Sequence, residues 1–501
     1  MSKSLRILFG LLVVFALVAT SCGNDDDSGT TTTPAATDEP APAPAPDDDG
    51  DTDEPAPAPE PDSDGDTEEP APAPEPDSDG DTDEPAPAPE PEVPSTIVEL
   101  GGGAVIDMAE CPEEWDNYAG VTDDEIRLGS SLPRSGALAG FGTIADGIQL
   151  YFDYVGPIDG RSVVVVSRDD AYVPARTVTN VEEMIDVENL LGFAGILGSP
   201  NNLAVRDTLN ENCIPQLLNL TGLPEWGDPT NYPWTTGALM SYDTEAFVWC
   251  RHIADELGAG ATAAVLALGN DAGEAWRVAF NNCAADAGIE VVDEVKHDPQ
   301  ADSVGADVIT LAASNADVLV VASSGAFCPQ AVATVASLPW EPLTLVTNGC
   351  QRIALFWVPI GPLANGIRLV NNQKDLSDAS LADDEWVQFV RSALEEQGVD
   401  PDAESHALGY IFGEVLHEVL MDAAEMDGGI NRTNVMRAMW QVDFESRGAL
   451  GNALRTMDGA NDSYMVETGR IEELVVDADG AYYRPISDII SFEGETGTYG
   501  Q

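Results

Sequence analysis

The chain has 501 residues, more than one hydrophobic core usually organises, so two lobes or domains are expected besides any unfolded part. It carries 89 Asp and Glu residues against 21 Lys and Arg, a formal net charge of −68 at pH 7. A negative field of this size repels nucleic acids and anionic lipid surfaces, so both are poor binding partners. Such an acidic excess is typical of a salt-rich habitat or, equally, of an acidic envelope protein.

Residues 1–21 have the pattern of a secretory signal peptide. Lys3 and Arg6 precede the apolar run ILFGLLVVFALVA, which is too short to favour a membrane-spanning helix. The following stretch VATSC resembles the lipobox of bacterial lipoproteins, although Ala19 stands where lipoboxes prefer a larger aliphatic residue. The resemblance predicts a lipid anchor at Cys22 and an extracytoplasmic location at the bacterial cell membrane. A plain signal peptide with an unmodified Cys22 is the alternative.

Residues 22–100 form an acidic, Pro-rich linker. The segments DDDGDTDEPAPAPEP, DSDGDTEEPAPAPEP and DSDGDTDEPAPAPEP repeat with a period of about 15 residues. Such a composition cannot bury enough apolar surface to fold, so we predict a disordered tether. The DxDGDxxE pieces suggest calcium loops, but they lack flanking helices and the last Glu of an EF-hand. A solvated charge run is favoured over weak calcium binding, and no metal site is expected.

The stretch Ile126–Gly142 begins as a β-branched, apolar strand and breaks into a Gly/Ser/Pro loop. Apolar residues at helical spacing predict a helix over Thr143–Val155. Three more strands follow, each opening into a loop: Val163–Ser167, Leu191–Leu197 and Ile214–Leu220. In open α/β sheets, ligands bind at the carboxyl ends of the strands, so the functional residues are expected in these loops.

The alternation restarts after residue 240 and predicts a second α/β block. Its predicted strands are Ala263–Leu268, Ile289–Val295, Val318–Ala322 and Leu343–Val346. Its predicted helices are Ala246–Leu257, Glu274–Ala287 and Val304–Ala313. The segment Ile367–Val370 then crosses back, and helical patterns follow over Asp383–Glu396, Glu404–Ala424 and Asn431–Trp440.

Five segments carry a resemblance to a known family: GVTDDEIRLGSSLPRSGALAGFG, SRDDAYVPARTV, FAGILGSPNN, CIPQLLNLTGLP and ADVLVVASSGAFCPQ. In this order they resemble the branched-chain amino-acid (Leu/Ile/Val) type of periplasmic binding protein, class I, over roughly Val121–Asp488. The resemblance implies an α/β fold with two Rossmann-like lobes joined by three crossovers and a ligand cleft between them. Within 101–501, lobe 1 is expected at about 121–240 plus 367–455, and lobe 2 at about 241–366 plus 456–501.

The resemblance also implies where lobe 1 binds its ligand. The family's carboxylate-binding loop matches Leu197, Gly198 and Ser199, where a hydroxyl and the N–H groups of a helix N-terminus suit an anion. Capping of the helix by Ser199 is the alternative function of that residue.

Three further residues of lobe 1 match binding positions of the family. Leu220 and Thr221 correspond to contacts with the ammonium and carboxylate groups of an amino acid. Phe141 corresponds to an aromatic residue of the first loop, which acts as a cleft wall or packs beneath the loop.

Lobe 2 departs from the family pattern, which usually presents Tyr, Tyr and Glu in three successive loops. This chain instead offers Asp271, then Ser324 or Phe327, and then Asn348. Asp271 can replace the ammonium acceptor, or it can cap the helix that follows it. The ligand is therefore an amino acid or a similar small polar molecule, with a short amide and a small aromatic acid left open.

Seven cysteines leave six once Cys22 is set aside, which is consistent with three disulfides. The expected topology favours three pairs: Cys111 with Cys213, Cys250 with Cys283, and Cys328 with Cys350. Free buried thiols are the alternative for one or more of these residues. No Cys/His spacing predicts zinc or redox chemistry.

No motif supports catalysis or a cofactor. None of the four His residues stands beside a nucleophile motif, and the Gly-rich stretches lack both dinucleotide and P-loop patterns. The resemblance therefore implies a solute-binding receptor that delivers its small-molecule ligand to ABC permease subunits, and the residues themselves do not predict an enzyme. A ligand-sensing lipoprotein coupled to a membrane signalling partner, and a structural or adhesive envelope lipoprotein with a vestigial cleft, are the alternatives.

Overall fold

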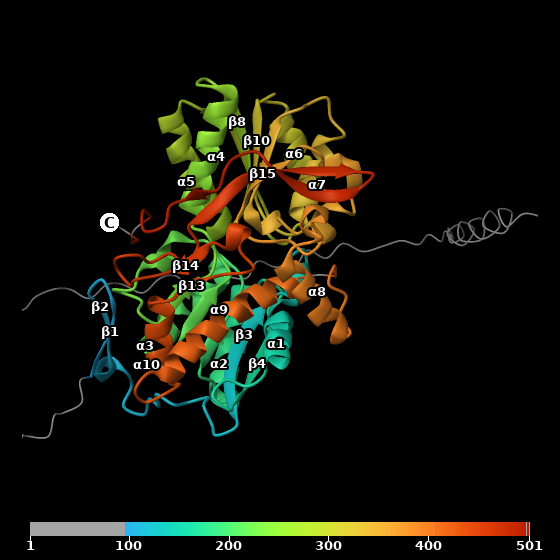
Figure 1. Cartoon of the computed structure of the whole chain (residues 1–501). Coiled ribbons are helices and arrows are strands. Elements are labelled where there is room, and N and C mark those ends of the chain that lie inside the picture. Colours follow the sequence, from blue (N-terminus) through green and yellow to red (C-terminus); the bar gives the residue numbers. More distant parts are fainter. Residues whose placement is uncertain (1–95, 404, 497, 500–501) are drawn as a thin grey trace, which may run out of the picture. The chain divides into compact units, whose positions relative to one another are not determined.

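The computed structural model describes residues 96–499 apart from residues 404 and 497. It contains two α/β lobes, each built on its own sheet, which confirms the predicted fold class (Figure 1). The predicted signal peptide, Cys22 and the predicted linker up to residue 95 lie outside the described residues. The predicted linker boundary at residue 100 is too late, because β1 (Ile97–Gly101) already pairs antiparallel with β2 (Ala104–Asp107). No helix in residues 96–499 is long and apolar enough to cross a bilayer.

The sheet of lobe 1 is parallel and has the strand order β4-β3-β5-β6-β7. Its strands are β3 (Glu125–Leu132), β4 (Ser162–Asp169), β5 (Gly192–Ala194), β6 (Gln216–Asn219) and β7 (Thr235–Gly237). Ile126 and Leu128 in β3 are fully buried, as expected for a central strand covered on both faces. The loops that follow these strands lie at one edge of the sheet.

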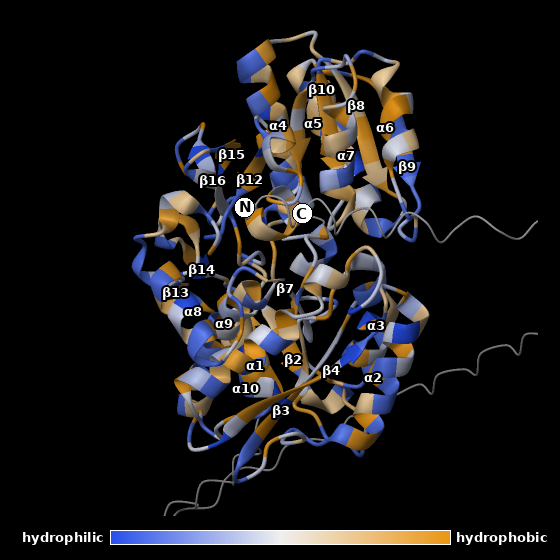
Figure 2. Ribbon diagram, turned by 90° about the vertical axis from the view of Figure 1, so that its right-hand side faces the viewer, coloured by the Kyte–Doolittle hydropathy of each residue, from blue (hydrophilic) through white to orange (hydrophobic). Residues whose placement is uncertain are grey.

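Helices cover both faces of this sheet (Figure 2). They are α1 (Ile144–Val155), α2 (Pro174–Glu188), α3 (Ser199–Glu211), α9 (His406–Glu425) and α10 (Arg432–Trp440). The helices α2 and α3 enclose a small separate core around Met184 and Phe193. On the other face α1 and α9 approach backbone to backbone, since a Cβ on Gly147 would lie 2.2 Å from the carbonyl oxygen of His406.

The sheet of lobe 2 is mixed and has the order β16-β15-β12-β11-β10-β8-β9, with β17 added on β15. Its parallel strands are β8 (Thr262–Leu268), β9 (Glu290–His297), β10 (Val318–Ala322), β11 (Leu343–Val346) and β12 (Arg368–Asn371). The antiparallel strands are β15 (Thr468–Asp477), β16 (Gly480–Pro485) and β17 (Ile490–Ser491). The helices of this lobe are α4 (Tyr242–Leu257), α5 (Asp271–Ala287), α6 (Gly305–Ala312) and α7 (Phe327–Val335).

Three connections join the lobes, as the resemblance implies. The chain leaves lobe 1 after β7, returns through α8 (Glu385–Glu396) into α9, and leaves again for β15 after the hairpin of β13 (Asp443–Glu445) and β14 (Leu454–Thr456). Because β12 belongs to the sheet of lobe 2, the crossing back follows Asn371 and not residue 367.

Three disulfides are present, in the expected pairs. Cys111 bonds to Cys213, Cys250 to Cys283, and Cys328 to Cys350. The first bond closes a span of 102 residues and fixes the segment before β3 to lobe 1. The Nε1–H of Trp115 adds to this attachment by donating to the carbonyl oxygen of Cys213 at 2.8 Å.

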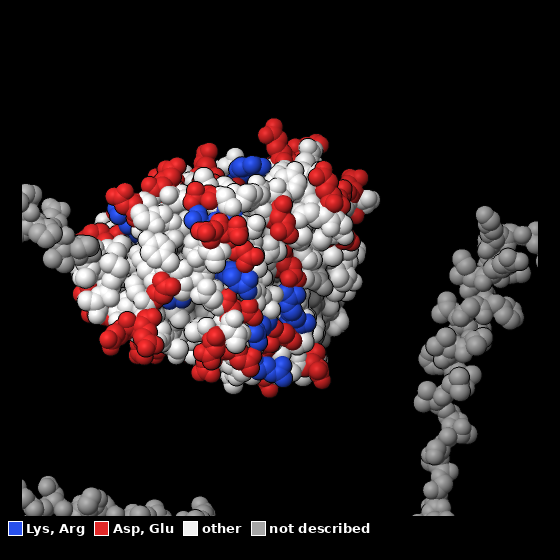
Figure 3. All heavy atoms as spheres, turned by 90° about the horizontal axis from the view of Figure 1, so that it is seen from below, with Lys and Arg blue, Asp and Glu red and all other residues white. Residues whose placement is uncertain are grey.

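Acidic side chains are spread over the face seen in Figure 3, with fewer Lys and Arg residues among them. Several of the basic side chains lie in ion pairs, such as Arg134 with Asp146 at 2.7 Å and Arg168 with Glu183 at 2.6 Å. The negative charge of the chain is therefore a property of the folded surface as well as of the linker.

Candidate functional site

A cavity of about 90 Å³ lies where the strand-end loops of the two sheets face each other. Its volume holds several water molecules or one small organic molecule. Most of its lining is apolar or aromatic, with polar groups at a few positions, as is usual for small-molecule sites. The lining residues are Leu138, Phe141, Ile144, Tyr172, Leu197, Gly198, Ser199, Leu220, Leu239, Tyr242, Leu268, Ala272, Trp276, Ser324, Asn348, Gly349, Gln351, Arg352, Asn372, Gln373, Leu408 and Phe412.

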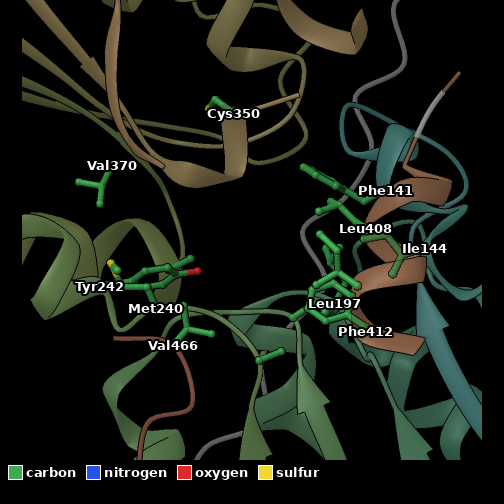
Figure 4. Close-up of a cluster of buried hydrophobic side chains, with 14 of the residues drawn as sticks. Phe141, Ile144, Leu197, Met240, Tyr242, Cys350, Val370, Leu408, Phe412 and Val466 are labelled. Atoms are coloured by element: carbon green, nitrogen blue, oxygen red, sulfur yellow. The ribbon is translucent and has the colours of Figure 1, made fainter. Parts of the chain in front are cut away.

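The apolar wall comes from lobe 1. Figure 4 shows Phe141, Ile144, Leu197, Leu408 and Phe412 close together, although they come from the first loop, α1, the loop after β5, and α9. Each is buried or nearly so, and the packing of α1 against α9 brings them to one place. This wall suits an apolar ligand body.

The N-terminus of α3 opens into the cavity beside this wall. Gly198 precedes the helix with φ +99°, which favours glycine, and Ser199 is the first helical residue. The first-turn N–H groups of a helix lack intrahelical partners and carry partial positive charge, so this end suits an anion. Ser199 does not cap the helix: its hydroxyl lies 2.5 Å from that of Thr221, which in turn lies 3.2 Å from the hydroxyl of Tyr242.

Aromatic side chains form the opposite wall. The rings of Tyr242 and Trp276 lie 3.8 Å apart between centroids, and both line the cavity. Behind them the fully buried Glu245 accepts hydrogen bonds from the Nε1–H of Trp276 at 2.8 Å and from the backbone N–H of Asn348 at 2.7 Å. Burial raises the pKa of Glu245 to about 8, although both hydrogen bonds favour the charged form. One carboxyl group thus orients two parts of the cavity lining.

Polar side chains complete the lining near the crossover after β12. Arg352 is 2% exposed, and its Nε lies 4.0 Å from Oδ2 of Asp375. The Nε2–H of Gln351 donates to Oε1 of Gln373 at 2.9 Å. The guanidinium of Arg352 places a second positive group in the cavity wall, besides the N-terminus of α3.

The structure brings most of the predicted binding residues to the cavity: Phe141, Leu197, Gly198, Ser199, Leu220, Ser324 and Asn348. Thr221 is buried behind Ser199 and does not line the cavity. Phe327, the alternative to Ser324, packs in the core of lobe 2 against the ring of His297.

Asp271 is not in the cavity, contrary to the expectation from the sequence. It is exposed at the first position of α5 and does not cap that helix either. The cap is Asn270, whose side chain accepts from the N–H of Gly273 at 3.2 Å. The preceding residue therefore has the capping function, because only its backbone has the extended conformation of an N-cap.

The sequence analysis missed Tyr172, Tyr242, Trp276 and Arg352. Tyr172 lies in the SRDDAYVPARTV segment, directly after a predicted strand, so its position at a strand end was a usable signal. Tyr242 and Trp276 lie on helices, where an aromatic residue at helical spacing is indistinguishable from an ordinary core residue.

Two other groups of reactive side chains lie away from the cavity. His297 and Ser323 are buried in lobe 2 with Nε2 and Oγ 2.8 Å apart, and burial lowers the pKa of His297. Among the described residues, Asp462, Glu467 and Glu493 have carboxylate oxygens within 4.8 Å of one another. None of these five residues lines the cavity.

Comparison with solved structures places the fold among substrate-binding proteins. A fatty acid ABC transporter substrate-binding protein from Thermomonospora curvata aligns with a TM-score of 0.64 and 19% identity, over 77% of this chain and 97% of that one. A branched-chain amino-acid ABC transporter protein from Thermus thermophilus, with bound valine, aligns with a TM-score of 0.63 and 18% identity, over 74% and 97%.

A third structure is a solute-binding protein from R. palustris in complex with 4-hydroxybenzoate. It aligns with a TM-score of 0.62 and 17% identity, over 74% of this chain and 97% of that one. A search of curated proteins finds no match. The family model for periplasmic binding proteins, in contrast, matches residues 125–469, which include most of both lobes and all the residues that line the cavity. The chain therefore belongs to the periplasmic binding protein family, and it shares its fold with substrate-binding proteins of ABC transporters.

Proposed function

We propose that the protein captures a small carboxylic acid with an apolar or aromatic body in the cleft cavity and delivers it to an ABC permease. The observation that carries this proposal is the composition of the cavity. Ser199 at the N-terminus of α3 and the guanidinium of Arg352 suit a carboxylate, and most of the remaining wall is apolar or aromatic. The names of the three similar structures mention a fatty acid, valine and 4-hydroxybenzoate. These three compounds share a carboxyl group and an apolar body.

An amino acid is one member of this class, and its ammonium group needs acceptors. None of the described residues that line the cavity is Asp or Glu, and Asp271 is outside it. Neutral oxygens, such as those of Ser324 and Asn348, are the acceptors that the described lining offers. We therefore expect acids without an ammonium group to bind at least as well as amino acids of the same size.

A thermal-shift screen of the full-length protein tests this proposal. The panel pairs acids with their neutral amides: benzoate with benzamide, 4-hydroxybenzoate with 4-hydroxybenzamide, and hexanoate with hexanamide, together with leucine, valine and phenylalanine. A ligand at a hundredfold excess over its Kd stabilises the folded state by about 2.7 kcal/mol, so a specific acid should raise the unfolding midpoint while its amide does not. Equal shifts for acids and amides, or no shift with any acid, would contradict the proposal.

Ser199→Ala removes a hydroxyl at the proposed carboxylate end, and Ser446→Ala is its matched control. Ser446 is also fully buried and donates one hydrogen bond, to Glu414 at 3.1 Å, but it does not line the cavity. We expect Ser199→Ala to weaken binding of the acid found in the screen by about tenfold, measured by calorimetry, and Ser446→Ala to leave it unchanged.

We also propose that Cys22 carries a lipid anchor and that the acidic repeats act as a tether for the binding domain. The lipobox-like VATSC stretch and the family's extracytoplasmic location support this proposal. Labelling of cells with an alkyne fatty acid should tag the wild-type chain, and Cys22→Ser should abolish the tag. A label that persists in Cys22→Ser would rule out this anchor site.

A further inference from the structure

The bend after β4 holds two consecutive non-glycine residues in the left-handed region. Ala171 has φ +50° and Tyr172 has φ +60°, a conformation that costs free energy for residues with a Cβ. Two neighbouring carboxylates hold the bend: Asp169 accepts from the N–H of Ala171 at 2.9 Å, and Asp170 accepts from the N–H of Tyr172 at 2.8 Å. Strain that the surroundings maintain in this way is typical of functional positions.

The bend directs Tyr172 from lobe 1 toward lobe 2. Tyr172 is 7% exposed and lines the cavity. Its hydroxyl accepts a hydrogen bond from Nδ2–H of Asn270, at the start of α5, with the two atoms 3.0 Å apart. The ring also lies against the carboxylate-binding loop, because a Cβ on Gly198 would be 2.3 Å from Cε2 of Tyr172. One side chain therefore contacts the cavity, its anion-binding end and the other lobe.

Asn270 is held in place for this contact. Its Oδ1 caps α5 through the N–H of Gly273 at 3.2 Å, so that only Nδ2 is directed at Tyr172. The hydroxyl hydrogen of Tyr172 has no acceptor within hydrogen-bond distance among the described residues. A hydroxyl that already accepts from Asn270 can donate this hydrogen to an anion in the cavity.

The same bend supports a second contact between the lobes. Asp169 also accepts from the N–H of Arg134 at 2.7 Å and from the hydroxyl of Ser135 at 3.1 Å. Two residues further on, the carbonyl oxygen of Ala137 accepts from the N–H of Ala326 in lobe 2 at 3.2 Å. Both contacts across the cleft thus depend on one hydrogen-bonded support in lobe 1.

We infer that Tyr172 is a positioning residue that latches the two lobes together through Asn270 and donates its hydroxyl hydrogen to the ligand's carboxylate. The latch rests on the contacts of Tyr172 with Asn270 and with the cavity, and the donation to a carboxylate rests on the proposed function. The contact with Asn270 stabilises the closed arrangement, and a bound anion strengthens it by polarising the hydroxyl. The closed arrangement is therefore favoured both by protein–protein contacts and by the ligand.

Amide hydrogen exchange of the full-length chain, without ligand, tests the latch. Tyr172→Phe removes only the hydroxyl, and we expect exchange in the facing loops, residues 134–142 and 322–330, to become about fivefold faster. Tyr410→Phe is the matched control: its hydroxyl accepts from Gln397 at 2.6 Å away from the cleft, so exchange in the two loops should not change. Unchanged exchange in Tyr172→Phe would overturn the inference.

Two variants of Asn270 test the latch from the other lobe and do not depend on the folding of Tyr172→Phe. Serine and aspartate both cap helices well, so both preserve the start of α5. Serine is too short to reach Tyr172, whereas aspartate can accept a hydrogen bond from its hydroxyl. We expect Asn270→Ser to accelerate exchange about fivefold and Asn270→Asp to behave as the wild type, and equal exchange in the two variants would refute the latch. Because no ligand is used, failure of the acid screen leaves these outcomes unaffected.

Discussion

Glu245 offers a quantitative test of how the cavity is supported. It is fully buried in α4, where its two carboxyl oxygens accept from Trp276 and from the backbone of Asn348. Burial raises its pKa from 4.5 to about 8 in the folded protein. The folded protein therefore holds a proton on Glu245 over a pH range in which the unfolded chain has lost it.

The sign of the effect follows from this proton. Below pH 4.5 Glu245 is protonated in both the folded and the unfolded state, so its contribution to the free energy of unfolding is fully present. As the pH rises from 4.5 toward about 8, only the unfolded state loses the proton, and this contribution is lost. The free energy of unfolding falls by about 1.4 kcal/mol for each pH unit in this range, which amounts to about 3 to 4 kcal/mol between pH 5 and pH 8. Glu245→Gln removes the titrating group while it keeps the size of the side chain.

Urea unfolding at pH 5, 6, 7 and 8, followed by tryptophan fluorescence, measures this difference. We expect Glu245→Gln to lie close to the wild type at pH 5, apart from one weakened hydrogen bond, and to gain about 3 to 4 kcal/mol relative to it by pH 8. Glu256→Gln, an exposed position in the same helix, should follow the wild type throughout. A constant difference between Glu245→Gln and the wild type across this range would refute the protonated, buried carboxyl group.

Two further substitutions probe the structure around the cavity and the segment before β3. Gly198→Ala should lower the free energy of unfolding by about 2 to 4 kcal/mol, because its backbone is strained and its Cβ meets Tyr172 at 2.3 Å. Gly156→Ala, at φ +93° with no atom within 4 Å of the new Cβ, should cost only about 1 to 2 kcal/mol, and equal losses in urea melts would argue against the clash. Replacing Cys111 and Cys213 together by Ser should lower stability by about 4 kcal/mol, since the bond closes a span of 102 residues; a melt unchanged by the double replacement would show that the bond constrains nothing.

Local patterns explain how much of the fold the sequence could predict. The β-branched run VVVVS lies in β4, and Gly198 and Pro200 mark the start of α3. Both signals depend only on neighbouring residues, so they can be recognised in the sequence. The loops after parallel strands meet at one edge of the sheet, so the sequence could place Leu197, Ser199 and Asn348 at the cavity without knowledge of the packing. The strand boundaries were less accurate, since β5 comprises only Gly192–Ala194 of the predicted Leu191–Leu197.

The cavity walls could not be predicted in the same way, because they depend on contacts between elements. Trp276 lies in the second turn of α5, and no local pattern distinguishes it from a core residue. Only the packing of α4 against α5 brings the ring of Tyr242 to the ring of Trp276, with 3.8 Å between the centroids. The same packing brings the carboxylate of Glu245 to the indole nitrogen of Trp276. The position of the cap of α5 was also missed: Asn270 caps the helix, and Asp271 faces solvent. A shift of one residue in the start of the helix decides which of the two side chains is the cap.

The strand-end loops and the helices contribute differently to ligand choice. The loop residues at the N-terminus of α3 supply the proposed anion-binding end, which suits any carboxylate. The shape of the rest of the cavity depends instead on side chains from helices of both lobes, Trp276 and Phe412 among them. Three structures with the same fold and 17–19% identity are named for a fatty acid, valine and 4-hydroxybenzoate, so the fold itself does not select the ligand body. Selectivity in this protein should therefore change when the aromatic wall or Tyr172 is altered, while the preference for a carboxylate should persist until the N-terminus of α3 or Arg352 is changed.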